Sequence, residues 1–218
     1  YVQVKQATAV QLLAASLDKH SDIYTEEEMT GGSSNADYFR ISQFYMETSQ
    51  NLAKYQALSL AGEDVSMEFF GVYVLSLAKD STFKGILNIA DTVTSINGKT
   101  FESSAQLIEY VSGLELGSDV TVGYESLGEK LSAEGQIIKL DNGKNGIGIG
   151  LVDHTEVKTD VPIEFQTENI GGPSAGLMFT LAIYTQLADP TLRDGRDIAG
   201  TGTIEQDGSV GDVGGVDK

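Results

Sequence analysis

Cysteine does not occur in the 218 residues, and histidine occurs only as His20 and His154. Without a thiol the chain cannot form disulfides, use a thiolate nucleophile, or build a thiolate zinc site or an iron–sulfur cluster. Two histidines are also too few for most histidine-rich metal centres. We therefore expect no metal site and no cofactor.

Basic residues are scarce as well: 14 lysines and arginines stand against 32 acidic residues, which gives a net charge of −18 and a pI near 4.3. This charge repels phosphates and anionic lipid headgroups, so we expect no nucleic-acid partner. No segment approaches the roughly 20 consecutive apolar residues of a membrane-spanning helix. The chain starts at Tyr1 without a leader and stops inside a glycine-rich turn, so we expect it to be a piece of a longer protein.

Hydrophobic residues make up 40% of the chain, enough for a proper core. The first 65 residues predict a helical N-terminal region with helices near residues 9–15 and 38–60. The candidate inward positions of the second helix are Phe39, Ile41, Phe44, Tyr45 and Leu52. From residue 66 onward the sequence pattern predicts short strands.

Residues 66–136 predict a small α+β module. A buried strand at residues 71–77 is followed by a turn and second strand that end at Asn97-Gly98, a strong hairpin signal. A helix at residues 103–111 and an alternating strand at 120–124 complete the set.

Ser174 lies at the start of an apolar segment, residues 174–187, that predicts a helix buried in a core. Two glycines permit a tight turn before it, and Pro173 suits a first helical position. Free N–H groups and the helix dipole at this point would stabilise an oxyanion. The alternative is that Ser174 only caps the helix.

The strand and hairpin motifs FFGVYV (69–74), GIL (85–87) and DTVTSINGK (91–99) resemble a PDZ domain, with Ala90 in place of the usual glycine before Asp91. The resemblance implies that a peptide terminus is bound between a sheet edge and a helix. By position, the peptide-binding residues would be Phe70, Gly71, Val72 and Tyr73 on the strand and Leu107 and Val111 on the helix. The alternative is that these residues only build the core.

Three further motifs, GPSAG (172–176), TGTI (201–204) and GGV (214–216), resemble the proteolytic domain of the Lon family in their order. The resemblance implies an α/β module at residues 137–218 that is truncated at its C-terminus. A PDZ module before such a domain is similar to the membrane-anchored, Lon-like proteases of Gram-positive bacteria. The expected fold is thus α+β, with two modules behind a helical N-terminal region.

The Lon resemblance implies a Ser–Lys dyad. Ser174 would be the nucleophile, the Thr201 hydroxyl would hold the lysine amine, and the N–H groups of Gly172 and Ser174 would form the oxyanion hole. A lysine with its ordinary pKa of about 10.4 is charged at neutral pH, so the base must lie in an apolar setting that lowers this value.

The family pattern places the lysine one position after Lys218. Either the chain ends just before its lysine, or Lys218 serves after a change of register. A second departure is Gly171, where the best-known members have an aspartate. This departure puts in doubt a mechanism that needs an acidic neighbour, although it leaves the Ser–Lys pair untouched.

Two weaker signals carry no site. Gly98-Lys99-Thr100 ends like a phosphate-binding loop, but Val93 stands where the loop needs glycine, so we expect no nucleotide. His154, between acidic neighbours, suggests an exposed polar turn rather than a metal ligand. The run GIGIG at residues 146–150 predicts a strand and a bend.

The expected function is an ATP-independent serine endopeptidase whose PDZ module recruits or gates unfolded or tail-exposed protein substrates. We expect this fragment to be inactive if its lysine lies beyond the end. The alternatives are a non-catalytic peptide-binding scaffold and a self-processing protein. By resemblance alone, the intact protein would be a ring-shaped homo-oligomer, secreted or on the extracellular face of the membrane.

Overall fold

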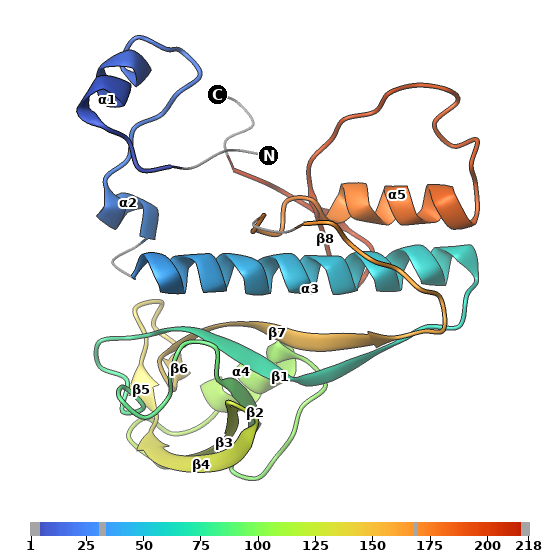
Figure 1. Ribbon diagram of the computed structural model, residues 1–218. Coiled ribbons are helices and arrows are strands. Elements are labelled where there is room, and N and C mark those ends of the chain that lie inside the picture. Colours follow the sequence, from blue (N-terminus) through green and yellow to red (C-terminus); the bar gives the residue numbers. More distant parts are fainter. Residues whose placement is uncertain (1–4, 31–33, 168–169, 215–218) are drawn as a thin grey trace.

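The computed structural model describes residues 5–30, 34–167 and 170–214. A twisted sheet with one helix forms the lower part of the molecule in Figure 1, and a second helical unit forms the upper part. The long helix α3 (Asn35–Ala61) runs between them and contacts both. The chain is therefore a mixed α and β protein with a helical N-terminal region, as the sequence predicts.

Local signals explain where the N-terminal helices begin and end. Helix α1 (Ala9–Ala15) starts at a capping box between Thr8 and Gln11, which satisfies two N–H groups that the helix leaves open. Helix α2 (Glu26–Thr30) is short. Helix α3 starts at Ser34 and ends at Gly62, whose φ of 78° closes the last turn.

The buried face of α3 differs from the predicted one. Phe39 is 62% exposed and Tyr45 36% exposed, so these two inward positions are wrong. The buried residues are mostly small: Met46, Ser49, Ala53, Ala57 and Leu58. Helix α3 packs closely against another helix along this face, and small side chains permit that close approach.

One five-stranded sheet organises the lower part, in the order β4-β3-β2-β1-β7, with all neighbouring strands antiparallel. Its strands are β1 (Ser66–Leu77), β2 (Thr92–Ile96), β3 (Asp119–Ser126), β4 (Glu129–Gln136) and β7 (Ile149–Lys158). Helix α4 (Ser104–Ser112) and the short pair β5 (Ile138–Lys139) and β6 (Asn145–Gly146) complete this part. Strand β7 thus joins the sheet from beyond residue 136.

The Asn97-Gly98 turn forms, but it does not join two paired strands of the sheet. Ile96 and Lys99 exchange two backbone hydrogen bonds of 3.0 and 2.9 Å across it. The chain then leaves for α4 and returns as β3, which pairs with β2. The sheet and α4 enclose one core that includes Val72, Phe83 and Val122.

Besides α1 and α2, the upper part contains α5 (Gly176–Leu187) and the two short strands β8 (Thr203–Ile204) and β9 (Val210–Gly211). It forms a smaller core in which Ala53 and Ala57 of α3 meet Ile183 and Ile204. Among the described residues, no helix has the length and apolar character needed to cross a membrane.

Candidate functional site

Among the described residues, strand β7 pairs with β1 on one side and with no strand on the other, and its backbone pattern shows which groups face this free edge. On the inner side, the Gly148 carbonyl accepts a hydrogen bond of 2.8 Å from the N–H of Ala78, the residue that follows β1. On the outer side, the carbonyls of Asp153 and Thr155 accept from side chains of α3. The backbone N–H and C=O groups of successive residues in an antiparallel strand point alternately to its two sides. The backbone groups of the odd-numbered residues, which include Ile149 and Leu151, therefore point to the outer side.

Two hydrogen-bonded contacts delimit this edge, one between β7 and α4 and one between β6 and the segment that follows α4. At one end, the Asp153 carboxylate accepts hydrogen bonds from the hydroxyl and N–H of Ser104, the first residue of α4; burial raises the pKa of Asp153, and these bonds oppose that effect in part. At the other end, Asn145 Nδ2 donates to the Leu114 carbonyl at 2.8 Å. The outward-pointing backbone N–H and C=O groups of Ile149 and Leu151 lie along the edge between these two contacts.

The turn that precedes β7 is also well fixed. Ser81 Oγ donates to the Ile147 carbonyl at 2.7 Å, and both residues are buried. Gly148 has a φ of +74°, and a Cβ there would lie 2.9 Å from side-chain atoms of Ile138 and Ser81. Only glycine fits this position, so the GIGIG run has a defined role in shaping the start of the edge.

The structure does not bring the predicted strand residues to a free edge. Val72 pairs with Val93 of β2 on one side and with Asp153 of β7 on the other. Tyr73 is paired on both sides in the same way, and Phe70 lies at a bulge between Phe69 and Gly71. The strand with an open edge beside α4 is therefore β7 rather than β1.

The predicted helix residues face the core. Leu107 and Val111 are 3% and 4% exposed and pack with Val72 in the main cluster. Ile149 and Leu151 are partly buried against the same cluster. The sequence signal for the edge was the GIGIG run, whose glycines and alternating isoleucines are typical of a turn entering a strand.

His154 lies in β7 rather than in an exposed turn. Its ring stacks on Tyr73 with a centroid distance of 4.1 Å, and Tyr73 stacks on Phe44 of α3 at the same distance. Its Nδ1 lies 2.9 Å from Thr92 Oγ1. Burial lowers the pKa of His154, although the negative charges of Glu156 and Glu125 oppose this effect.

Glu47 and Glu156 lie near this stack, and burial affects the pKa of Glu47 and of Tyr73. The Tyr73 hydroxyl donates to Glu47 Oε1 at 3.4 Å. Burial raises the pKa of both groups, and the negative charge of Glu47 raises that of Tyr73 further. Within the described ranges, no group of histidine and carboxylate side chains is arranged to hold a metal ion.

Ser174 is exposed and does not cap α5, whose N-cap is Ala175, with no side-chain capping bond. The Ser174 carbonyl accepts from the Gly202 N–H at 2.9 Å and from Thr201 Oγ1 at 3.0 Å. Thr201, predicted to orient a lysine amine, thus donates its hydroxyl to the Ser174 backbone. Lys218 lies outside the described residues.

Helix α3 holds the other side of the Ser174 turn. The Gly172 N–H, a predicted oxyanion donor, donates to the Ser42 carbonyl at 2.8 Å. Ser49 Oγ donates to the Pro173 carbonyl at 3.0 Å. In the described part of the chain, the N–H groups of Ser174 and Ala175 have no hydrogen-bond acceptor.

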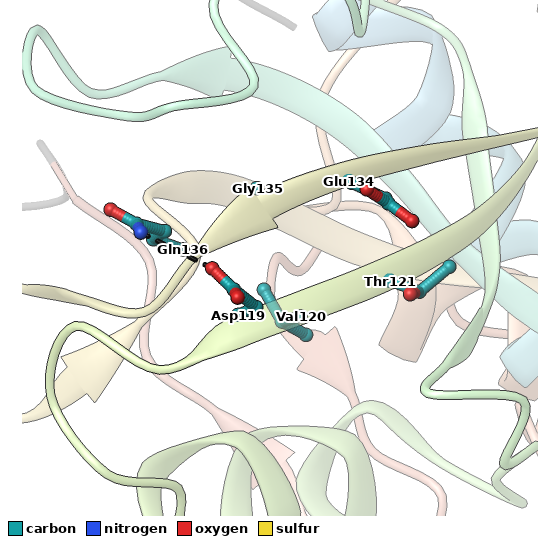
Figure 2. Close-up of a pocket in the computed structure, with 6 residues that line it drawn as sticks. All are labelled: Asp119, Val120, Thr121, Glu134, Gly135 and Gln136. Carbon is teal, nitrogen blue, oxygen red and sulfur yellow. Dashed lines mark hydrogen bonds between the residues drawn. The ribbon is translucent and has the colours of Figure 1, made fainter.

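Ser174 lines neither of two surface depressions. One, of about 380 Å³, lies on the β3–β4 hairpin and is lined by Asp119, Val120, Thr121, Glu134, Gly135 and Gln136 (Figure 2). Its Asp119 and Gln136 side chains bond to each other at 3.2 Å. The other, of about 260 Å³, lies between α3 and the segment around Phe165 and Thr167. Neither holds a residue of the predicted catalytic set.

Part of the chain matches a known protein family. Residues 43–137 match the family model of the PDZ domain. No curated protein matches the chain.

Three of the solved structures that are similar to this chain come from Listeria. The PDZ domain of the SdrC-like protein of Listeria monocytogenes is 32% identical, over 38% of this chain and 90% of that chain, with a TM-score of 0.37. The corresponding domain of Listeria innocua is 34% identical, over 38% and 96%, with a TM-score of 0.37. The second domain of a Listeria protein is 37% identical, over 39% and 86%, with a TM-score of 0.36.

Proposed function

The chain belongs to the proteins that carry a PDZ domain, and from this premise we propose that its β7 edge binds the C-terminal tail of a partner protein as an added strand. The observation that carries the proposal is the outward-facing backbone of Ile149 and Leu151, between the Asp153–Ser104 contact and the Asn145–Leu114 contact. PDZ domains bind peptides and protein C-termini, so this family and this edge favour the same function.

The chemistry of the edge fits an apolar tail. Backbone hydrogen bonds to Ile149 and Leu151 would supply affinity that is independent of the tail's sequence. Ile149 and Leu151 themselves pack against the apolar cluster that contains Leu107 and Val111 of α4, so a tail with apolar side chains would extend that packing. The fixed turn at residues 146–148 would receive the end of the tail.

Peptide titration tests this function with two matched glycine variants. Gly148→Ala introduces backbone strain and a close contact with Ile138 and Ser81, whereas Gly143→Ala introduces similar strain at φ +77° with no atom within 4 Å. Fluorescence anisotropy with the labelled peptide Ala-Ser-Leu-Val should show binding by the unmodified chain. We expect Gly148→Ala to weaken it about tenfold and Gly143→Ala to leave it within about twofold.

The control peptide is the same sequence with an amidated C-terminus. If the unmodified chain binds neither peptide, the proposed function is wrong. Equal weakening by both glycine variants would also contradict it, because the effect would then follow from strain alone.

A second activity, Ser–Lys peptidase, is favoured by the Lon-like motifs and by the setting of Ser174. Its hydroxyl is exposed, it does not cap α5, and the N–H groups of Ser174 and Ala175 are available to an oxyanion. Because the Gly172 N–H is bonded to Ser42, the oxyanion hole in this arrangement would use Ser174 and Ala175. The lysine would be Lys218 or the residue after it.

This activity is tested in a chain that continues past residue 218. With denatured casein as substrate, Ser174→Ala should reduce hydrolysis by roughly 10³-fold or more, because a nucleophile and its base act as a unit. Peptide binding at β7 should not change. Unchanged hydrolysis would exclude Ser174, and absence of hydrolysis in both proteins would favour a peptide-binding scaffold.

Mass analysis of the same two proteins separates self-processing from action on other proteins, since only self-processing shortens the chain itself. By the same resemblance, the peptidase would form a ring-shaped homo-oligomer and work on the extracellular face of the membrane or in secreted form.

A further inference from the structure

Helix α3 already occupies the far part of the β7 edge. Thr48 Oγ1 donates to the Asp153 carbonyl at 3.0 Å, and Asn51 Nδ2 donates to the Thr155 carbonyl at 2.7 Å. These two carbonyls belong to the same outward-facing series as Ile149 and Leu151. Because Thr48 and Asn51 are three residues apart on a helix, one face of α3 reaches both carbonyls.

We propose that α3 is a built-in competitor for this edge, so that a bound tail pairs with Ile149 and Leu151 and extends further only by displacing Thr48 and Asn51. This inference rests on the proposed binding of a tail to β7. A strand added beyond Leu151 needs the Asp153 and Thr155 carbonyls as acceptors for its own N–H groups. A side chain of α3 stands in that position on each of them, so the helix and a long tail exclude each other there.

Displacement of α3 from β7 should also change the turn at residues 172–174, because α3 forms hydrogen bonds with this turn. The Ser42 carbonyl accepts from Gly172, and Ser49 Oγ donates to Pro173. These contacts lie within about two helical turns of Thr48 and Asn51. A long tail that moves α3 away from β7 should therefore loosen the Gly172 N–H, while a short tail should not.

The aromatic stack opposes this displacement. Phe44 of α3 stacks on Tyr73 at 4.1 Å, which anchors the helix to the sheet independently of Thr48 and Asn51. Removing the two polar side chains should thus make it easier for a tail to move α3 off the edge, without unfolding the helix. This independence makes the competition testable with conservative substitutions.

The experiment compares two tails in the full 218-residue chain. The probes are labelled Ala-Ser-Leu-Val and a ten-residue peptide with the same four residues at its end, preceded by alternating alanine and serine. In the unmodified chain we expect dissociation constants within about threefold of each other. In Thr48→Val/Asn51→Ala, the long probe should bind about tenfold tighter and the short one unchanged, since each backbone bond gained is worth about two- to tenfold.

Gln56→Ala is the matched control, because Gln56 Nε2 donates from the same helix to the Glu205 and Gln206 carbonyls, away from β7. It should leave the length dependence unchanged. Circular dichroism checks folding, and Thr48→Val alone gives a second, milder variant that should show part of the gain.

The outcomes separate the inference from the function it rests on. If the short probe binds but the double variant gains nothing for the long probe, or the unmodified chain already prefers the long probe tenfold, the competition is refuted while tail binding stands. If neither probe binds any form, both fall. Hydrogen exchange of the Gly172 amide, faster only with the long probe, supports the link to Ser174; no change refutes that link.

Discussion

His154 joins three elements through contacts of a single ring. It belongs to β7, bonds to Thr92 of β2, and stacks on Tyr73 of β1, which in turn stacks on Phe44 of α3. A neutral imidazole suits this stack, because burial disfavours the charged form and lowers the pKa of His154. Glu47, Glu125 and Glu156 lie near enough to act on this group of side chains.

This residue predicts a pH dependence of stability. Because the folded pKa of His154 lies below the ordinary value of 6.5, the unfolded chain binds more protons as the pH falls through that value. The free energy of unfolding should therefore fall, relative to His154→Phe, between about pH 7.5 and pH 5.5. Urea titrations of both proteins measure the difference.

The comparison with His154→Phe removes the other titrations from the result. Burial raises the pKa of Glu47 and Asp153, so both gain protons in the folded state first and stabilise it as the pH falls. These contributions are common to both proteins and cancel in the difference. A difference that is the same at both pH values would show that His154 does not titrate between the folded and unfolded states.

At the scale of elements, α3 depends on small residues where it packs against α5. Ala53 and Ala57 are fully buried in the cluster shared with Ile183. A larger side chain at this contact would force the helices apart, because protein cores have little free space.

We therefore expect Ala53→Leu to reduce the free energy of unfolding by about 1–3 kcal/mol. Ala36→Leu is the control, since Ala36 is exposed on the first turn of the same helix and the substitution leaves helix propensity nearly unchanged. Urea unfolding measures both variants. Equal stability of Ala53→Leu and the unmodified chain would show that the α3–α5 contact has room to spare.

Elements with local signals could be predicted from the sequence, and those that depend on distant partners could not. The helix near residues 9–15, the helix that starts at Ser103, the turn at Asn97 and the apolar helix that begins near Ser174 are all confirmed. Each of these features is decided by residues within four positions along the chain.

The position of β7 is an example of a feature that could not be predicted from the sequence. The pairing of β7 with β1 joins residues some 80 positions apart, and no local pattern states which side of β1 is covered. The sequence prediction therefore placed a bound peptide along Phe70–Tyr73, although β2 and β7 pair with Val72 and Tyr73 from both sides in the structure. The bonds that link α3 to the turn before α5, from the Gly172 N–H to the Ser42 carbonyl and from Ser49 Oγ to the Pro173 carbonyl, were missed for the same reason. Neither a helix carbonyl nor a serine hydroxyl indicates its distant partner in the sequence.

For the molecule as a whole, α3 determines how the two units are related. It contributes side chains to the β7 edge on one side and to the Ser174 turn on the other. In Figure 1 its C-terminal half lies between the sheet and α5. A change at either unit that moves this helix should therefore reach the other.

The net charge of −18 acts on every ligand of the molecule. Its field should favour basic tails over acidic ones through the encounter rate, whatever contacts the edge makes. We expect a probe Ala-Lys-Ala-Ser-Leu-Val to bind several-fold tighter than Ala-Glu-Ala-Ser-Leu-Val at about 20 mM salt. At about 0.5 M salt the ratio should approach one, because the screening length falls well below the size of the molecule.

The uncharged Ala-Ser-Ala-Ser-Leu-Val is the control and should change little with salt. Stopped-flow measurements should place the difference between the charged probes in the association rate, since a long-range field steers encounter rather than holding the bound state. A preference for lysine that persists at high salt, or that lies in the dissociation rate, would instead indicate a specific acidic partner at the edge. Asp153 lies two residues from Leu151 in β7, and Asp153→Asn would then test whether it is that partner.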